Sequence, residues 1–225
     1  FAREGVQVVV SDEPLIRRCR DKRQAAALFE ELRMAAPRVM APDALCFPCF
    51  GKPYDGSRSV RAVKLATAAD LTDAMRADPE LMFTEYVDGS HDEYTVDAYF
   101  GRAGNLCCLV PRHRVEVRDG ESSKGVTRRN HVYDYLLQRL GRIEGARGCL
   151  TLQLFAHPGR AHYVGVEINP RFGGGYPLSY AAGANYTGWL IDEYLLERDI
   201  PFFDGWEADL LMLRYDAQVL AHGAA

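Results

Sequence analysis

The sequence predicts a fold of the α+β class, in which antiparallel strands and separate helices share the chain. Residues 94–100 alternate polar with apolar side chains, which is typical of an antiparallel strand that buries one face. Residues 150–155 and 162–168 are two further β-favouring runs, close enough in sequence to form a hairpin. Residues 21–36 carry an apolar stripe at helical spacing. Together these patterns favour antiparallel sheets accompanied by helices.

The composition is ordinary for a soluble globular protein, with 225 residues of which 48% are hydrophobic and 26% charged. This length allows one large domain or two small ones. A formal net charge of −4 argues against nucleic acid as the main partner, because proteins that bind it carry a basic surplus. No apolar run approaches membrane-spanning length and no signal peptide is visible, so we expect a cytoplasmic protein without membrane contact.

The six cysteines are scattered and lie mostly in apolar stretches, which favours free, buried thiols over disulfides. Cys46 and Cys49 have CxxC spacing, but no second Cys or His pair completes a zinc site. We therefore expect no metal at these cysteines.

The first residues predict the end of another structural unit. The chain begins with Phe1 and leads into an apolar run at residues 6–10, which predicts a buried strand in need of neighbours. We expect residues 1–20 to be the remnant of a preceding α/β domain with its linker. The chain would then be a fragment or one part of a split protein.

The remaining elements follow from periodicity and turn residues along the chain. Asp21 can cap the helix at 21–36, with Gln24 at capping-box spacing. Further helices are expected at residues 69–76, 132–140, 177–184 and 187–197. Further strands are expected at residues 46–52, 61–65, 81–87, 106–117 and 210–215.

The end of the last hairpin strand carries the clearest chemical motif. Glu167 and Asn169 point to the same side, because strand side chains alternate, and Pro170 ends the pairing. A carboxylate beside an amide oxygen suits a hard cation such as Mg²⁺. Arg171 adds a fork-shaped cation for phosphate or carboxylate, and the glycines at 173–175 let backbone N–H groups approach an anion. The alternative is a glycine turn with Glu167 and Arg171 as a surface ion pair.

Two lysines stand beside expected turns. Lys22 lies in the first turn of its helix, where a cation opposes the helix dipole unless an anion is near. Lys52 closes a strand and precedes a glycine- and serine-rich segment at 53–59, which forms a flap able to lie over phosphates. A solvated lysine and a plain polar hairpin are the alternatives. The spacing does not fit the P-loop pattern GxxxxGK[ST], so that fold is excluded.

Two acids and a glutamine extend the candidate site. Glu85 sits inside an otherwise apolar strand and Glu93 starts the next one. An inward carboxylate needs a partner, such as an adenine amino group or ribose hydroxyls, and a solvent-facing acid is the rival interpretation. Antiparallel pairing of the hairpin could bring the amide of Gln153 beside Glu167.

Residues 119–130 are rich in glycine, serine and arginine without periodicity, which predicts a mobile loop that closes over ligands. We expect its cations, with two arginines that point outward from the preceding strand, to capture an anion such as a substrate carboxylate. A solvated loop is an equally good interpretation. The basic residues concerned are Arg112, Arg114, Lys124, Arg128 and Arg129.

Taken in order, these stretches resemble the ATP-grasp superfamily, closest to its carbamoyl-phosphate-synthetase-like branch. The resemblance spans roughly residues 21–197 and rests on six segments, which are residues 21–22, 51–59, 83–89, 93–97, Gln153 and 167–175. It implies an ATP-grasp fold in which two α+β subdomains with antiparallel sheets hold ATP between them. The implied parts are a connecting helix at 21–40, subdomain 1 (the lid) at 41–88, and subdomain 2 with the metal site at 89–225.

The resemblance also implies roles for individual residues. The nucleotide-binding residues would be Lys22 and Lys52 on the α- and β-phosphates, Gly56, Ser57 and Ser59 in the phosphate flap, Glu85 with the backbone of Tyr86 and Val87 on adenine, and Glu93 on the ribose. The ligands of Mg²⁺, which Mn²⁺ could replace, would be Gln153, Glu167 and Asn169. Arg171, facing the γ-phosphate and the acyl phosphate, and Lys52 would be catalytic. The substrate-binding candidates are Gly174 and the five basic residues named above.

The implied activity is that of a carboxylate–amine ligase. ATP phosphorylates a carboxylate, and an amine or similar nucleophile then displaces phosphate. Such chemistry rests on positioning and charge neutralisation, which fits a candidate site without an obvious catalytic His or Cys. The expected partners are small-molecule carboxylate and amine substrates, with a second copy of the chain or a missing N-terminal domain as further partners. Alternatives are a non-catalytic nucleotide-binding module, a kinase-like module, and carbamoyl-phosphate-synthase-type phosphorylation within a split enzyme.

Overall fold

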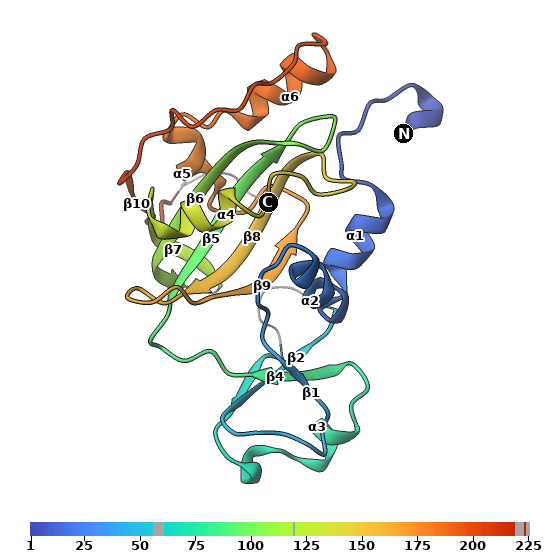
Figure 1. Cartoon of the computed structure of the whole chain (residues 1–225), viewed down its shortest axis with the longest axis vertical. Helices are drawn as coiled ribbons and strands as arrows, with labels where there is room; N and C mark the ends of the chain where they lie inside the picture. Colours follow the sequence, from blue (N-terminus) through green and yellow to red (C-terminus); the bar gives the residue numbers. More distant parts are fainter. Residues whose placement is uncertain (56–60, 119, 219–222, 224–225) are drawn as a thin grey trace.

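The computed structural model describes residues 1–55, 61–118, 120–218 and 223. The described chain forms two antiparallel sheets, one of four strands and one of six (Figure 1). The smaller sheet has the order β1-β4-β2-β3, with β1 (Val39–Met40), β2 (Cys49–Pro53), β3 (Val63–Leu65) and β4 (Leu81–Glu85). The larger has the order β10-β7-β6-β5-β8-β9, with β5 (Asp92–Phe100), β6 (Leu106–Arg118), β7 (Glu121–Thr127), β8 (Gly148–Ala156), β9 (Tyr163–Asn169) and β10 (Leu211–Leu213). The predicted α+β class is confirmed.

Among the α-helices, all but α5 (Tyr176–Ala181) begin at a residue whose side chain accepts a hydrogen bond from one of their first backbone N–H groups. They are α1 (Glu13–Arg20), α2 (Lys22–Glu31), α3 (Asp73–Ala77), α4 (His131–Leu137), α5 (Tyr176–Ala181) and α6 (Tyr186–Tyr194), with short 3₁₀ helices η1 (Ala2–Glu4) and η2 (Ala68–Asp70). Asp12 accepts a hydrogen bond from the backbone N–H of Leu15, and Asp21 accepts one from that of Arg23. These caps start α1 and α2 in close succession, and both helices pack beside β9 near the junction of the two sheets (Figure 1).

Each sheet has an apolar core of its own. The smaller core consists of Met40, Cys49, Leu65 and Phe83. The larger core contains the apolar faces of β5, β6 and β8 together with residues of α1, α2 and α4. The two sheets are thus separately packed units that meet beside α2 and β9.

The packing of α2 on β9 depends on Gly165. The ring of Phe29 is 1% exposed and lies directly on this glycine, so that a Cβ there would overlap the ring. We expect Gly165→Ala to lower the free energy of unfolding by about 1–3 kcal/mol, as overpacking of a core does. Urea denaturation would measure the loss. Gly159→Ala is the matched control, because the atom nearest to a Cβ there lies at 3.7 Å, and equal losses in both variants would contradict the prediction.

The strand expected at residues 6–10 is wrong, whereas the expected remnant of a preceding domain with its linker stays a prediction. Residues 6–10 form no strand, and Val6, Val8 and Val10 are exposed. An apolar run becomes a strand only where another strand offers backbone partners, and no strand of the described chain does so here. Residues expected as a linker form α1, whose signals were the Asp12 cap and Pro14 in its first turn.

The mobile loop expected at residues 119–130 is also wrong for the residues that the structure describes. Glu121–Thr127 is β7, which pairs with β6 on one side and β10 on the other. Two neighbouring strands satisfy the backbone of this glycine- and serine-rich segment, although its side chains show no strand periodicity. Asp119 lies outside the described residues. The expected division at residues 21–40, 41–88 and 89–225 stays a prediction.

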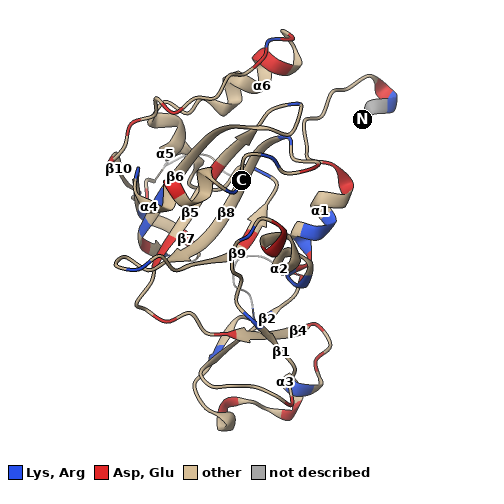
Figure 2. Cartoon of the chain, viewed as in Figure 1, with Lys and Arg blue, Asp and Glu red and all other residues tan. Residues whose placement is uncertain are grey.

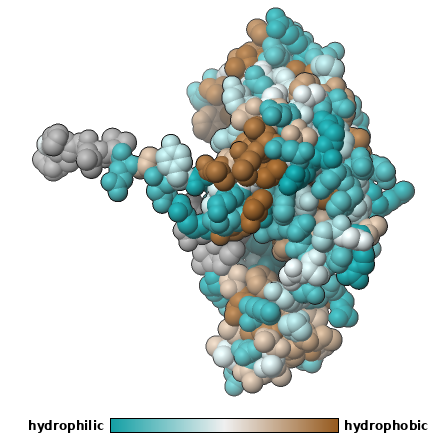
Figure 3. Space-filling model, turned by 90° about the vertical axis from the view of Figure 1, so that its left-hand side faces the viewer, coloured by the Kyte–Doolittle hydropathy of each residue, from teal (hydrophilic) through white to brown (hydrophobic). Residues whose placement is uncertain are grey.

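Apolar side chains remain exposed at the outer edge of the larger sheet. Leu211 and Leu213 of β10 are exposed, as are Val115 and Val117 of β6. Figure 3, which views the molecule from the side of β10, shows apolar side chains gathered near the middle of this face. Among the helices of the described chain, none has the length and apolar character needed to cross a membrane.

Candidate active site

One face of the larger sheet is polar, and the strand register brings its side chains together. Thr95 of β5 lies opposite Arg112 of β6 and Gln153 of β8, and Gln153 in turn lies opposite Glu167 of β9. Cross-strand partners share a face of the sheet. The register therefore confirms the expected approach of Gln153 to Glu167. Figure 2 shows the charged residues that these central strands carry.

Gln153, Glu167 and Asn169 form one hydrogen-bonded group. Asn169 Nδ2 donates to Glu167 Oε1 at 2.8 Å. The Gln153 amide, oriented to satisfy its neighbours, donates to the same oxygen at 3.2 Å and accepts from Arg114 Nη1 at 3.2 Å. The two amides thus place positively polarised N–H groups beside the carboxylate, at the position that a bound cation would also take.

This donor set fits a hard cation. If either amide turns over, it presents an oxygen beside the Glu167 carboxylate, and oxygen ligands are what Mg²⁺ prefers. Within the described part of the chain, no cluster of three or more His, Cys, Asp or Glu side chains could hold a metal ion. A metal at this face would therefore depend on amide oxygens in addition to Glu167.

Arg114 joins this group to Glu93. Its Nη1 donates to Glu93 Oε1 at 2.5 Å and its Nη2 donates to the carbonyl of Gly120 at 2.7 Å, while its buried Nε has no hydrogen-bond partner among the described residues. The pKa of the Glu93 carboxyl is raised above its ordinary value. Burial is the main cause, and the nearby Glu167 adds to it, while the charge of Arg114 partly opposes the shift. The expectation that Arg112 and Arg114 point outward is wrong, since they are 2% and 9% exposed. Both lie on the polar face beneath the glycine turn.

Asp97 and Arg112 form a buried ion pair that the sequence analysis did not identify. Arg112 Nε donates to Asp97 Oδ2 at 2.8 Å, and Ser179 Oγ donates to the same oxygen at 2.6 Å. A Cβ on Gly175 would collide with the Arg112 guanidinium, so the glycine turn lies directly on the pair. A fully hydrogen-bonded pair makes a rigid floor for the site. The polar position of Asp97 in an alternating strand was the signal that could have revealed it.

Lys22 and Lys52 approach this face from two different elements. The backbone N–H of Lys22, at the start of α2, donates to the carbonyl of Tyr54 just after β2, and both lysines line a small pocket between α2 and the smaller sheet. Burial lowers the pKa of the Lys52 ammonium, the charge of Lys22 lowers it further, and Glu167 raises it. Basic residues also gather in the last turn of α1 and the first of α2 (Figure 2). The four arginines of these turns form ion pairs with carboxylates of the protein, so Lys22 and Lys52 are the candidates for binding a polyanion.

Two pockets meet at the end of β9. The outer pocket has a volume of about 340 Å³ and lies against Arg20, Lys22 and Asp55. The inner pocket, of about 60 Å³, lies on the polar face beneath the glycine turn. Glu167, Asn169 and Arg171 line both pockets. The residues of the carboxylate–amide motif at the end of β9 therefore lie where the two pockets join.

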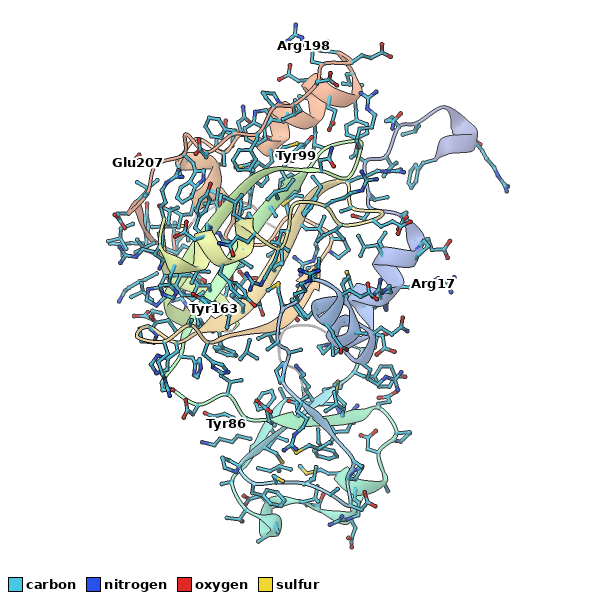
Figure 4. The ribbon with its side chains drawn as sticks, viewed as in Figure 1. Arg17, Tyr86, Tyr99, Tyr163, Arg198 and Glu207 are labelled. Atoms are coloured by element: carbon cyan, nitrogen blue, oxygen red, sulfur yellow. The ribbon has the colours of Figure 1, made fainter. Side chains whose placement is uncertain are left out.

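The residues expected around adenine are only partly placed. Glu85 is exposed at the end of β4, so its expected inward direction is wrong. Tyr86 lies in the connection between the two sheets (Figure 4), with the Lys64 ammonium 4.1 Å from the centre of its ring. The roles of Glu85, Tyr86 and Val87 stay predictions. The expected flap residues Gly56, Ser57 and Ser59 lie outside the described residues.

The three cations expected on the loop bind elsewhere. Lys124 Nζ lies 2.6 Å from Glu116 Oε2, Arg128 Nη1 lies 2.5 Å from Asp209 Oδ1, and the Arg129 guanidinium lies 4.4 Å from the centre of the Trp206 ring. None of the three lines the outer or the inner pocket. Lys124 lies in β7, and Arg128 and Arg129 follow directly after it; their expected part in capturing a substrate stays a prediction. Gly174 does line the inner pocket and stays a candidate.

A family model described as "ATP-grasp in the biosynthetic pathway with Ter operon" matches residues 77–208, more than half of the chain. The chain belongs to the ATP-grasp family. No curated protein sequence matches it. The expected ATP-grasp membership is confirmed, and the carbamoyl-phosphate-synthetase-like branch stays a prediction.

Superposition on solved structures shows that this chain has the ATP-grasp fold. The biotin carboxylase domain of the Hydrogenobacter thermophilus 2-oxoglutarate carboxylase superposes with a TM-score of 0.73 at 12% identity, over 93% of this chain and 52% of that one. N5-carboxyaminoimidazole synthetase of Staphylococcus aureus gives 0.64 at 14% identity, over 76% and 50%. The L-amino acid ligase of Bacillus licheniformis gives 0.59 at 14% identity, over 80% and 48%. The chain thus spans about half the length of these proteins.

Proposed function

We propose that this ATP-grasp chain is an ATP- and Mg²⁺-dependent ligase, which phosphorylates a carboxylate to an acyl phosphate that an amine or similar nucleophile then attacks. The observation that carries the proposal is the junction of the outer and inner pockets at Glu167, Asn169 and Arg171. A terminal phosphate in the outer pocket and a carboxylate in the inner pocket would meet there. In support, the 2-oxoglutarate carboxylase domain was solved with MgADP and bicarbonate and the Staphylococcus aureus synthetase with ADP.

The proposed reaction consists of two displacements. A carboxylate oxygen attacks the γ-phosphorus of ATP while the bond to the leaving ADP breaks. The nucleophile then attacks the carbonyl carbon, the carbon–oxygen bond to phosphate breaks, and the nucleophile gives up a proton. Both steps develop charge on phosphate oxygens, so cations and positioning matter more than a general base.

The residues divide this work between the two pockets. Lys22 and Lys52 would hold the α- and β-phosphates, and Arg171 would face the γ-phosphate and the acyl phosphate. Glu167, with the side-chain oxygens of Gln153 and Asn169, would hold Mg²⁺, which neutralises phosphate charge when bound. Glu93 accepts from Arg114 through Oε1, which leaves Oε2 for a ribose hydroxyl. The expected homodimer or N-terminal partner domain stays a prediction.

A screen for ADP release with pools of carboxylates and amines tests this function. We expect ADP and phosphate in equal amounts, dependent on Mg²⁺ and on one carboxylate, with an amide as the product. Binding of ATP without turnover across all pools would identify a non-catalytic module. A phosphorylated product that accumulates without any nucleophile requirement would identify a kinase.

A further inference from the structure

The inner pocket continues past the metal-binding group toward Glu121. This residue begins β7, and its carboxylate lies against Gly174, where a Cβ would collide with it. Glu121 and Ser122 also line a third pocket of about 190 Å³, together with Arg118 and Arg214. Arg171 thus lies where the inner pocket joins the outer pocket, and Glu121 lies where the inner pocket adjoins the third pocket.

Most charges around the inner pocket are already paired within the protein. Arg112 pairs with Asp97, and Arg114 pairs with Glu93. Glu167 accepts hydrogen bonds from the amides of Asn169 and Gln153 and is the candidate metal ligand. These groups have little capacity left to recognise a charged substrate.

Among the charged residues that line the inner pocket, Arg171 forms no ion pair within the described chain, and Glu121 forms only a long, exposed pair with Arg214. The Arg171 guanidinium donates only to the backbone carbonyl of Phe172 in the described chain, at 3.0 Å. The Glu121 carboxylate is 57% exposed, accepts no hydrogen bond from the described residues, and lies 3.7 Å from Arg214 Nη1. A ligand that satisfies both must itself carry an anion and a cation.

The size of the inner pocket limits that ligand. Its volume of about 60 Å³ has room for about four to six non-hydrogen atoms, since one water needs roughly 10–15 Å³ by the same measure. This is the size of the carboxyl, α-carbon and amino groups of an amino acid. A side chain could continue into the third pocket, which adjoins it at Glu121 and Ser122.

We propose that the carboxylate substrate is an amino acid, whose carboxylate faces Arg171 at the pocket junction and whose ammonium group binds Glu121. This inference rests on the proposed function, which it narrows to one class of substrate. Gly174 leaves the space that the Glu121 carboxylate needs, and Arg214 balances Glu121 when the pocket is empty of substrate. Glu121 is therefore a specificity-determining residue.

Hydroxylamine as the nucleophile makes the test independent of the natural amine. The carboxylate oxygen attacks the γ-phosphorus and ADP leaves; the hydroxylamine nitrogen then attacks the carbonyl carbon, and phosphate and a proton leave, so that a hydroxamate forms. Each amino acid is compared with the matching carboxylic acid that lacks the amino group. We expect wild-type protein to form hydroxamates from one or more amino acids and to use their desamino analogues poorly.

Glu121→Gln should raise the KM for the amino acid about 10- to 100-fold, because the neutral amide no longer makes a charge-assisted bond to the ammonium. The KM for the desamino acid and the KM for ATP should stay unchanged. Glu116→Gln is the control, because Glu116 lies on the same hairpin, pairs with Lys124 and does not line the inner pocket. An unchanged amino acid KM in Glu121→Gln, or an equal rise for both acids, would overturn the assignment.

A binding measurement separates this inference from the proposed function. With a non-hydrolysable ATP analogue and Mg²⁺ present, the amino acid should raise the melting temperature of wild type and of Glu116→Gln, and not that of Glu121→Gln. If this pattern holds without any hydroxamate or ADP, the amino acid site stands and the ligase proposal fails. If wild type forms hydroxamates from desamino acids as readily as from amino acids, the ligase proposal stands and the Glu121 assignment fails.

Discussion

Glu167→Gln is expected to keep the fold and to lose Mg²⁺-dependent turnover. A neutral amide binds a hard cation less well than a carboxylate does, and no other Glu or Asp completes a metal cluster within the described residues. Changes to groups that merely orient metal ligands cost about 10- to 100-fold in metal affinity, so loss of the carboxylate itself should cost at least about 100-fold. ADP release measured over a Mg²⁺ titration would show the shift.

Folding can be separated from metal binding in this variant. The Gln side chain still offers an oxygen to the Asn169 amide, which donates to Glu167 Oε1 at 2.8 Å, so the melting temperature should change little. Glu144→Gln, at an exposed position before β8, removes the same charge away from both pockets. Full activity of Glu167→Gln at ordinary Mg²⁺ concentrations would count against Glu167 as a ligand.

Lys52→Ala should weaken ATP binding by about 1.5–3 kcal/mol, or roughly 10- to 150-fold in Kd, because it removes a charge-assisted contact from a half-buried site. Calorimetric titration of the folded variant measures the change. Arg198→Ala is the control, since Arg198 carries the same charge at an exposed position, pairs with Asp192 and lines none of the three pockets around Lys22 and Glu167. Unchanged affinity in Lys52→Ala would refute the assignment of Lys52 to the phosphates.

The same titration should detect the ionisation of Lys52. Burial and Lys22 lower its pKa from the ordinary 10.5, so the charged ammonium destabilises the fold, and stability rises with pH through the window just below 10.5. A bound phosphate restores the charge and raises this pKa. In that window ATP binding should therefore take up protons, and its affinity should fall as pH rises. Lys52→Ala should abolish the uptake measured in buffers of different ionisation enthalpy.

The parts of the site that the sequence predicted correctly all come from one hairpin. Strand alternation placed Glu167 beside Asn169, and antiparallel pairing placed Gln153 opposite Glu167. Both inferences use only the period of a strand and the reach of a short turn, which are local properties. The chemistry of this hairpin could therefore be predicted before any tertiary contact was known.

The errors arose where a neighbouring element decided the outcome. Residues 121–127 form β7 because β6 and β10 lie on either side. The glycines and serines of this segment carry no pattern that predicts a strand. Residues 6–10 look like a buried strand but have no described partner strand. The strand pattern predicted that Arg112 and Arg114 point outward, whereas both are buried in the fold and Arg112 lies against Gly175.

By itself, the sequence determined the α+β class, most helices and strands, and the carboxylate–amide motif at the end of β9. Periodicity, helix caps and side-chain alternation depend only on residues close together in the chain, so each can be recognised without tertiary contacts. Only the tertiary structure decided which charges remain available to a ligand. Asp97 pairs with Arg112, Glu93 with Arg114, and Arg128 with Asp209, which leaves Arg171 without an ion pair in the described chain and Glu121 with only the long contact to Arg214. Such pairing depends on residues far apart in the chain, because a charge is neutralised by whatever lies within a few ångströms of it and not by its neighbours in sequence.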